Sequence, residues 1–489
     1  VEENTPSDIQ VALDPELLGK VFENLLGSYN PETSETARKD SGSFYTPREI
    51  VNFMVDESLK NYLTNKVNDL SENQLEALFN EANEKYTEPN NYKIIQQLKN
   101  IKILDPACGS GAFPMGILQR IVNLIQKCEE KNYSQKDLYE LKLELIEKCL
   151  YGIDIQPIAV QICKLRFFIS LICEQNKTDL SKDNYGFNPL PNLETKFVAA
   201  DSLIGLKEQQ KDVLNLQNDI LLNFKNELLE IRKKHFRASS SEEKFLNRKA
   251  DKEKREEIIK VLKSQLSNKN EELIQILKDE IKELQTQIDN LPIEMITISE
   301  SAGLFEDSSN KVKTIDKNEN LRKTLKRQLA EDKKNLEKEE SKKYNDQDSV
   351  QEIEELVSWN PYDQNAVSSF FDSDWMFNVS DGFDIVIGNP PYIQLQKDSG
   401  KLANKYENHN YSTFTKMGDI YCLFYEKGFN FLKSNGHLCF ITSNKWMRAG
   451  YGDKLREFFA TKTNPKLLID FAGVKVFESA TVDTNILLF

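Results

Sequence analysis

Short apolar runs and amphipathic segments follow one another in a repeating order over two parts of the chain, residues 101–206 and 383–489. Each run is followed by a polar turn and then by a helix-length segment whose apolar residues recur three or four apart. This order is typical of a doubly wound parallel α/β sheet. About seven strands are predicted, at residues 101–104, 149–153, 197–200, 383–387, 437–442, 466–471 and 485–489, with helices at 112–127, 157–173, 419–432 and 451–459.

Apolar residues at helical spacing also occur upstream of the sheet, in residues 1–99. Apolar positions three and four apart predict a helix over residues 8–28. Thr46 is suited to cap a second helix that Pro47 opens, because proline is favoured at the first helical position. Further helical pattern continues to about residue 99. We therefore expect an N-terminal helical region ahead of the sheet.

The α/β pattern is interrupted between residues 207 and 350. Leucines and isoleucines at helical spacing, with dense Lys and Glu between them, predict an inserted helical or coiled-coil arm. Its helices are predicted at 213–231, 259–291 and 321–336, and its turns at 239–241 and 308–320. A solvated packing arm is the simpler interpretation, and an arm that contacts DNA or another subunit is the alternative. The predicted divisions are 1–99, 100–206, 207–350 and 351–489, the second and fourth being the two halves of the sheet domain.

Composition excludes several classes of protein. The 489 residues carry a net charge of -14, which argues against a protein that coats nucleic acid non-specifically. Seven cysteines without CxxC pairs and three widely separated histidines favour neither a disulfide framework nor a zinc site. The acidic N-terminus is unlike a signal peptide, and no apolar run has the length of a membrane span, so a cytoplasmic protein is expected. Because the chain begins without methionine and stops inside a predicted strand, we interpret it as a piece of a longer protein.

Acidic residues follow three successive predicted strands: Asp105, Asp154 and Asp201. The first opens a glycine-rich turn, residues 105–111, that leads into a helix, as in many nucleotide-type cofactor sites. Any one of these aspartates alone could be a strand-end cap. Three at the ends of successive strands suit a ligand with an ammonium group, a ribose diol and an adenine amine. S-adenosylmethionine carries all three groups and no phosphate.

A rigid turn ends the predicted strand at residues 383–387. It reads Gly388-Asn389-Pro390-Pro391-Tyr392, and the two prolines prevent the strand from continuing. An amide, a proline carbonyl and a tyrosine ring together suit a planar base that carries an exocyclic amine. The segment therefore predicts a nucleobase-amine pocket at the carboxyl end of a strand.

These motifs, in this order and together with Phe44-Tyr45-Thr46-Pro47, resemble those of the gamma-class N6-adenine DNA methyltransferases. The closest similarity is to the methyltransferase region of type IIG restriction–modification enzymes, and it covers most of residues 40–205 and 380–489. It implies a Rossmann-like, seven-stranded methyltransferase sheet that uses S-adenosylmethionine and acts on double-stranded DNA. In this family a target-recognition domain follows the sheet, and we expect it to be absent here. A nuclease domain, with the Mg²⁺ it would need, is expected only upstream of Val1 in a longer parent.

Carried over by position, the resemblance implies roles for individual residues. Asp105 would hold the ammonium of the cofactor, Asp154 the ribose hydroxyls and Asp201 the adenine N6. Thr46 and its neighbours would contact the methionine end. The other residues expected at the cofactor are Tyr45, Ala107, Gly109, Gly111, Ile155 and Ser202.

The resemblance also implies how the target base is held. Asn389 and the carbonyl of Pro390 would accept hydrogen bonds from the target amine, Pro391 would shape the loop, and Tyr392 would stack on the flipped base. Phe477 lies where the family has a second aromatic residue that stacks on the opposite face, although a core phenylalanine is the alternative.

Three other functions remain open from the sequence. A protein-glutamine methyltransferase and an N4-cytosine DNA methyltransferase would share the same tetrapeptide. A non-catalytic specificity or scaffold component is the alternative of another class. A nuclease within these residues is not favoured, because an ExK triplet such as Glu280-Ile281-Lys282 is expected by chance in a Lys/Glu-rich helix.

Overall fold

A computed structural model describes residues 44–477 and 482–489, except for 69, 81, 83–84, 87, 130, 176–186, 188, 207–218, 300–311, 345–353, 356 and 358. The chain divides into two compact units, one formed by residues 1–206, 222–251 and 360–489, and the other by 207–221 and 252–359. The helix predicted over residues 8–28 lies outside the described residues.

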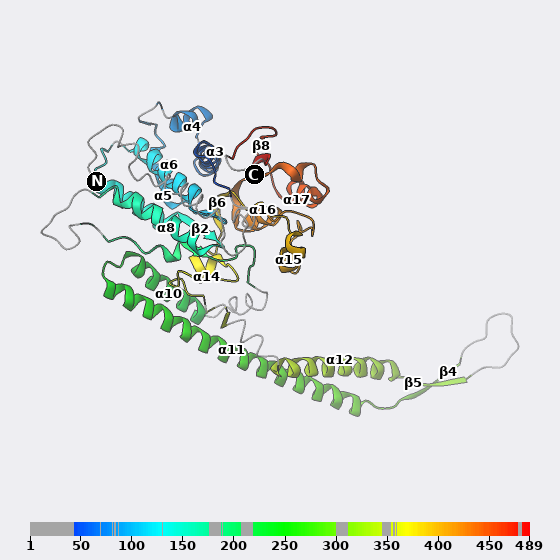
Figure 1. Cartoon of the computed structure of the whole chain (residues 1–489). Helices are drawn as coiled ribbons and strands as arrows, with labels where there is room; N and C mark the ends of the chain where they lie inside the picture. The colour runs from blue at the N-terminus through cyan, green and yellow to red at the C-terminus, as the bar shows by residue number, and fades with distance from the viewer. Residues whose placement is uncertain are drawn as a thin grey trace. The chain divides into compact units, whose positions relative to one another are not determined.

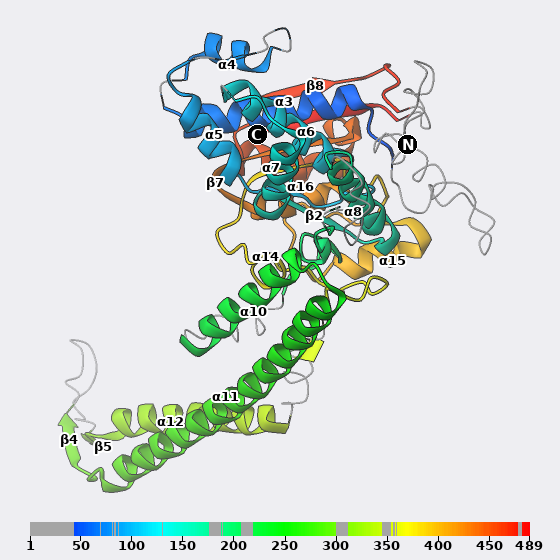
Figure 2. The ribbon, with the colours of Figure 1, turned by 90° about the vertical axis from the view of Figure 1, so that its left-hand side faces the viewer.

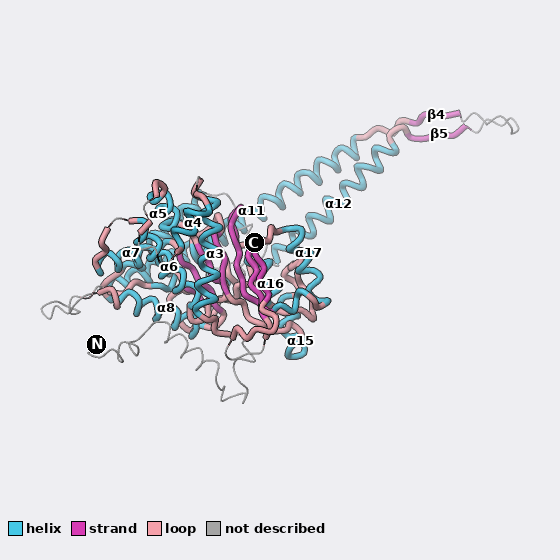
Figure 3. Tube along the Cα trace, turned by 90° about the horizontal axis from the view of Figure 1, so that it is seen from above, coloured by secondary structure: helices cyan, strands magenta, loops and turns pink. Residues whose placement is uncertain are grey.

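The first unit is built on one sheet, drawn in magenta in Figure 3. The sheet has seven strands in the order β3-β2-β1-β6-β7-β9-β8. All strands are parallel except β9, which runs antiparallel to both of its neighbours. The strands are β1 (Ile103–Asp105), β2 (Leu150–Asp154), β3 (Phe197–Ala199), β6 (Phe383–Gly388), β7 (Leu432–Ser443), β8 (Leu467–Asp470) and β9 (Thr484–Leu488). The prediction of a seven-stranded α/β sheet is confirmed, with β7 starting five residues earlier than expected.

Helices cover both faces of this sheet (Figures 1 and 3). One side carries α3 (Arg48–Lys66), α6 (Ala112–Cys128) and α8 (Pro157–Ile172), and the other carries α16 (Tyr421–Asn430) and α17 (Asp453–Lys462). Arg120 on α6 ties this layer to α3 through two bonds to Asp56, at 2.6 and 2.7 Å. The remaining helices of this unit are α4 (Glu72–Phe79), α5 (Asn91–Asn100), α7 (Gln135–Lys148), α10 (Asp219–Arg237), α14 (Ser373–Phe377) and α15 (Lys397–Tyr406), with short 3-10 turns at Leu193–Thr195, Asn444–Met447 and Gly450–Gly452.

The second unit is a helical hairpin that ends in a pair of strands. The long helix α11 (Ser241–Asn290) belongs to this unit from residue 252 onward. It lies beside α12 (Glu319–Tyr344) in Figures 1 and 2, and Lys278 pairs with Glu340 across them at 2.9 Å. The expected turn at residues 308–320 is wrong in part, because β5 (Val312–Asp316) pairs there with β4 (Met295–Ser299). Three of the five residues in each segment are β-branched, which favours such a ladder over a loop. The second arm helix also begins well before residue 259, since the charged segment from Ser241 continues it.

The turn between β1 and α6 is compact because Gly111 adopts a φ of 87°, in the left-handed region that favours glycine. A Cβ at this position would lie 2.5 Å from Sγ of Cys163 on α8. The turn and α8 can therefore approach each other only with glycine here.

We expect the substitution Gly111→Ala to lower the free energy of unfolding by about 2 kcal/mol, because it combines backbone strain with overpacking. Gly450→Ala is the matched control, since a Cβ at Gly450 meets nothing within 4 Å. Urea unfolding of the two variants measures the difference. Equal stability of both variants would contradict this account of the turn.

Candidate active site

The carboxyl ends of β1, β2, β3 and β6 open into one cavity of about 820 Å³. It lies where the strand order reverses between β1 and β6, which is the usual ligand position in doubly wound sheets. Nine residues predicted from the sequence line it: Thr46, Asp105, Ala107, Asp154, Ile155, Asp201, Ser202, Asn389 and Pro391.

Asp105 ends β1 and is only 1% exposed. Its Oδ1 accepts a hydrogen bond from the backbone N–H of Ala107 at 3.1 Å, whereas its buried Oδ2 has no partner among the described residues. Burial raises the pKa of Asp105 well above its ordinary value, the Ala107 N–H lowers it, and the charge of Asp154 raises it further. Gly388 on β6 allows this packing, since a Cβ there would lie 2.6 Å from Oδ1. A cationic group in the cavity would satisfy the remaining oxygen.

Asp154 ends β2 and organises the turn next to it. Its Oδ2 accepts from the N–H of Gly109 and its Oδ1 from the N–H of Gln156, both at 2.8 Å. Burial raises the pKa of Asp154, and these two hydrogen bonds oppose that rise. Each oxygen retains a second lone pair, so the carboxylate can still accept from hydroxyl groups in the cavity.

Asp201 follows β3 and is held by residues that sequence reasoning missed. The hydroxyl of Tyr406 donates to its Oδ2 at 3.0 Å, and Nζ of Lys405 lies 2.6 Å from the same oxygen. Both residues come from α15, which contains left-handed φ values at Asp398, Ser399 and Gly400. No local pattern links α15 to Asp201, because about 200 residues separate them along the chain.

The side-chain amide of Asn389 is fixed by the segment that begins at Phe44. Its Nδ2 donates to the carbonyl of Phe44 at 3.0 Å and to Oγ1 of Thr46 at 3.1 Å. A carbonyl can only accept, so this pair of bonds identifies the nitrogen side of the amide. The buried Oδ1 has no partner among the described residues and is left to accept from a group in the cavity.

Three aromatic rings meet beside Asn389. Phe44 stacks on Phe477 with 5.4 Å between centroids and lies at the same distance from Tyr392. The rings of Tyr392 and Phe477 are 6.2 Å apart and inclined at 60°. Two stacking contacts need about 7 Å, so a base fits between these rings only after they separate. Tyr392 is further held by a bond from its hydroxyl to the carbonyl of Ile441 at 3.2 Å.

The other predicted residues lie around the cavity without lining it. Tyr45 lines a separate pocket of about 330 Å³ between α3, α6 and α8. Phe477 is 1% exposed. The residues predicted from the sequence but absent from the cavity wall are Tyr45, Gly109, Gly111, Pro390, Tyr392 and Phe477. Phe424, within a correctly predicted helix, does line the cavity, although helical spacing alone did not identify it.

The described residues form neither a metal-binding cluster nor a helix that could span a membrane. No cluster of three or more His, Cys, Asp or Glu side chains is placed to hold a metal ion there. In the same part of the chain, no helix combines the length and apolar character that crossing a bilayer requires.

The chain matches known families along its length. Residues 148–477, about two thirds of the chain, match the Eco57I restriction-modification methylase family. Residues 79–203 match the DNA-methyltransferase domain of MmeI, and residues 13–74 match the N-6 DNA methylase family.

Individual relatives are similar over different lengths. The Methanocaldococcus jannaschii protein RM.MjaORFECS2P, classed with type II restriction enzymes and methyltransferases, is 28% identical over 98% of this chain and 38% of its own length. The type II methyltransferase M.PaeR7I of Pseudomonas aeruginosa is 33% identical over 20% of this chain and 17% of its own. The type II restriction enzyme and methyltransferase RM.Eco57I of Escherichia coli is 30% identical over 22% of this chain and 11% of its own. The chain thus spans less than two fifths of each of these relatives.

A double-mutant cycle tests the bond between Asn389 and Thr46. We expect Thr46→Val and Asn389→Leu to show a coupling energy of about 1 kcal/mol in urea unfolding, the usual value for one hydrogen bond. The control cycle combines Thr46→Val with Thr463→Val, whose hydroxyl bonds only to the carbonyl of Phe459 among the described residues. A coupling energy near zero in both cycles would show that the bond between Asn389 and Thr46 does not anchor the loop that follows β6.

Proposed function

The chain belongs to the Eco57I restriction-modification methylase family, and we propose that it transfers a methyl group from S-adenosylmethionine to the N6 amine of an adenine flipped out of double-stranded DNA. The observation that carries this proposal is the fixed amide of Asn389, whose Oδ1 is buried and lacks a partner among the described residues. The family argues for DNA rather than a protein glutamine as the substrate. Methylation of N4 of cytosine remains the nearer alternative, because its amine has the same chemistry.

The cavity fits the proposed cofactor. The unpartnered Oδ2 of Asp105 suits the ammonium of the methionine end, and Asp154 offers lone pairs for the ribose hydroxyls. Asp201 would accept from the adenine amine. Its Oδ2 already bonds to Tyr406 and Lys405, whereas its Oδ1 accepts one bond, from the N–H of Leu203, and retains a second lone pair. Thr46 is also in the wall, next to the amide of Asn389.

The target base would be held by Asn389, Pro390 and the aromatic rings. An amine inside a duplex cannot be reached, so the base must leave the stack, and stacking on Tyr392 helps offset that loss. The spacing of Tyr392 and Phe477 implies that the aromatic cluster opens when the base enters. Oδ1 of Asn389 and the carbonyl of Pro390 would accept hydrogen bonds from the N6 amine. These two bonds would orient the lone pair of N6 toward the methyl donor.

S-adenosylmethionine, when bound, supplies a methyl group on a positively charged sulfur that leaves readily. The chain's own residues would therefore act by orientation rather than as covalent nucleophiles. Asn389 would also disperse the positive charge that develops on N6 during transfer.

We propose that the chain consists of four functional segments, residues 1–99, 100–206, 207–350 and 351–489. The second and the fourth form the catalytic sheet. A target-recognition domain beyond this chain, and a Mg²⁺-dependent nuclease upstream of it, belong to the same proposal for a longer cytoplasmic parent. The resemblance to type IIG restriction–modification enzymes motivates that arrangement, which sequencing of the complete gene would test.

Asn389→Ala should reduce methyl transfer by about a hundredfold or more, because it removes an acceptor at the reacting amine. Cofactor affinity, measured by calorimetry, should change by no more than about threefold, since the main polar contacts proposed for the cofactor come from the aspartates and not from Asn389. Sequencing that detects modified adenines, on DNA from cells that express the protein, measures the transfer. Asn123→Ala on α6, outside the cavity wall, is the control. Normal methylation by Asn389→Ala would overturn the assignment.

Binding of S-adenosylmethionine should weaken as the pH falls through the pKa of Asp105. Only the ionised carboxylate pairs with the ammonium, and burial raises this pKa, so the loss begins at a higher pH than for an ordinary aspartate near 4. Asp105→Asn should bind at least about tenfold more weakly and lose this pH dependence. Calorimetry between about pH 4 and 8 measures both effects. Affinity that is independent of pH in the unsubstituted protein would contradict the role of Asp105.

A further inference from the structure

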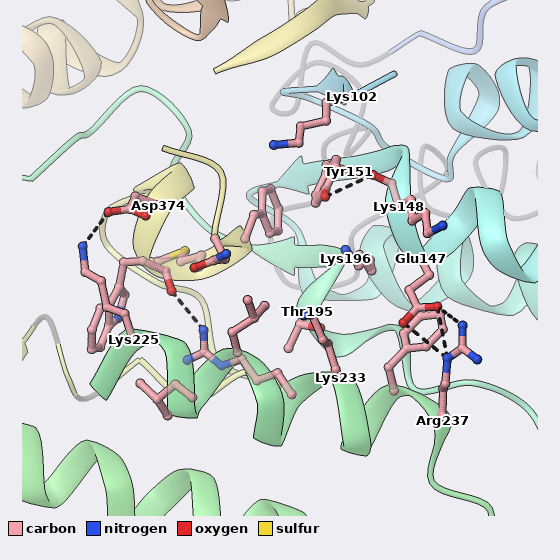
Figure 4. A pocket seen from close by; sticks show the side chains of 18 of the residues that line it. Lys102, Glu147, Lys148, Tyr151, Thr195, Lys196, Lys225, Lys233, Arg237 and Asp374 are labelled. Carbon is pink, nitrogen blue, oxygen red and sulfur yellow. Dashed lines mark hydrogen bonds and ion pairs between the residues drawn. The ribbon is translucent and has the colours of Figure 1, made fainter. Parts of the chain in front are cut away.

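A second pocket lies at the opposite, amino-terminal edge of the sheet (Figure 4). It has a volume of about 570 Å³ and is formed by the starts of β1, β2 and β3 together with α10 and α14. All of its lining residues belong to the first unit. Neither the proposed cofactor nor the target base uses this edge.

Basic side chains dominate the pocket: seven Lys or Arg residues line it against two carboxylates. Each of the strands β1, β2 and β3 is preceded by a lysine: Lys102, Lys148 and Lys196. Because these strands are parallel, the three lysines lie at the same edge of the sheet. Figure 4 shows Lys225, Lys233 and Arg237 on α10, which runs along the facing side.

Most of these cations are already paired with carboxylates. Lys102 lies 3.1 Å from Asp381 and Lys148 lies 2.7 Å from Glu144. The pairs on α10 are Lys225 with Asp374 at 2.5 Å, Arg232 with Asp251 at 3.1 Å, Lys233 with Glu230 at 2.8 Å and Arg237 with Glu147 at 2.5 Å.

Lys196 differs from its neighbours. Within the part of the chain that the structure describes, its ammonium makes no ion pair and instead lies 4.4 Å from the centroid of the Tyr151 ring. Burial lowers the pKa of Lys196 to about 8, with the charges of Lys102 and Lys233 contributing in the same direction and Glu147 opposing them. A partly buried cation near two other cations is stabilised by an anion.

The rest of the wall is apolar and aromatic. Leu228, Phe236, Met376 and Phe377 line the pocket with the ring of Tyr151. Such a wall favours a ligand with a flat or aliphatic body over a bare inorganic ion. We propose that this pocket binds a small amphipathic organic anion, with its acidic head group on Lys196 and its apolar body between Tyr151 and α10.

The probe is 1-anilinonaphthalene-8-sulfonate, whose fluorescence reports binding and whose sulfonate and rings match the two halves of the pocket. We expect Lys196→Met to weaken its affinity by about tenfold or more, and Lys196→Arg to keep it within about threefold. Lys148→Met is the matched control, because it removes a pocket lysine that Glu144 already neutralises, and it should change affinity by less than about twofold. Leu229→Trp, which fills the pocket, should abolish binding.

Two comparison ligands separate the contributions of charge and apolar contact. N-phenyl-1-naphthylamine has the same rings without the sulfonate and should bind equally to the unsubstituted protein and Lys196→Met. Inorganic sulfate should compete only weakly. Equal affinity of the sulfonate probe for the unsubstituted protein and Lys196→Met, or unchanged binding to Leu229→Trp, would overturn the proposal. If sulfate competed as strongly as the probe, the pocket would be a simple ion site. That result would also overturn the proposal.

Discussion

The pairing of β1 with β6 is the contact on which the rest of the first unit depends. It joins Ile103 to Ile385 and Leu104 to Val386, across about 280 residues of chain that include the whole arm. Closing so long a loop costs conformational entropy, although that cost grows only slowly with length. Asp384 helps to offset it: its backbone N–H donates to the carbonyl of Lys102, and its Oδ2 accepts from the N–H of Lys102 at 2.9 Å and from Lys433 at 2.9 Å. A buried carboxylate thus fixes the register in which the two halves meet.

The register between β1 and β6 determines which side chains meet at the carboxyl edge of the sheet. With β6 beside β1, Gly388 packs against the carboxylate of Asp105, and Asn389 is carried to the wall that the aspartates already form. The segment from Phe44 then completes the wall through its two bonds to Asn389. Three regions distant in sequence therefore supply one cavity. Two of them leave a buried oxygen without a partner among the described residues, Oδ2 of Asp105 and Oδ1 of Asn389. Unsatisfied buried polar atoms are costly, so two of them facing one cavity fit a site arranged for ligands rather than for stability.

Much of this arrangement could be predicted because the signals are local. The strands are short apolar runs, the aspartates follow them directly, and two prolines end β6, so the edge on which Asp105, Asp154 and Asn389 meet follows from the parallel pattern. Contacts made across the chain could not be predicted in this way. Nothing near Asp201 indicates that Tyr406 bonds to it, and the buried position of Phe477 against Phe44 depends on a loop that follows β8. The strand pair β4 and β5 was missed for a different reason: two-stranded ladders have weak signals, and the charged residues around them favoured a turn.

The direction of the strands also explains why the two edges of the sheet have opposite charge. In a parallel sheet every strand starts at the same edge, so a residue type that recurs before or after each strand accumulates instead of alternating. Aspartates gather at the carboxyl edge, where the charge of Asp154 adds to the raised pKa of Asp105. Lysines gather at the amino edge, where Lys102 and Lys233 add to the lowered pKa of Lys196. Among the described residues, Asp105 at the carboxyl edge and Lys196 at the amino edge make no ion pair, so a cation suits one edge and an anion the other. Because the strands between them are short and almost entirely buried, a ligand at one edge would act on the other mainly by stabilising the shared folded sheet.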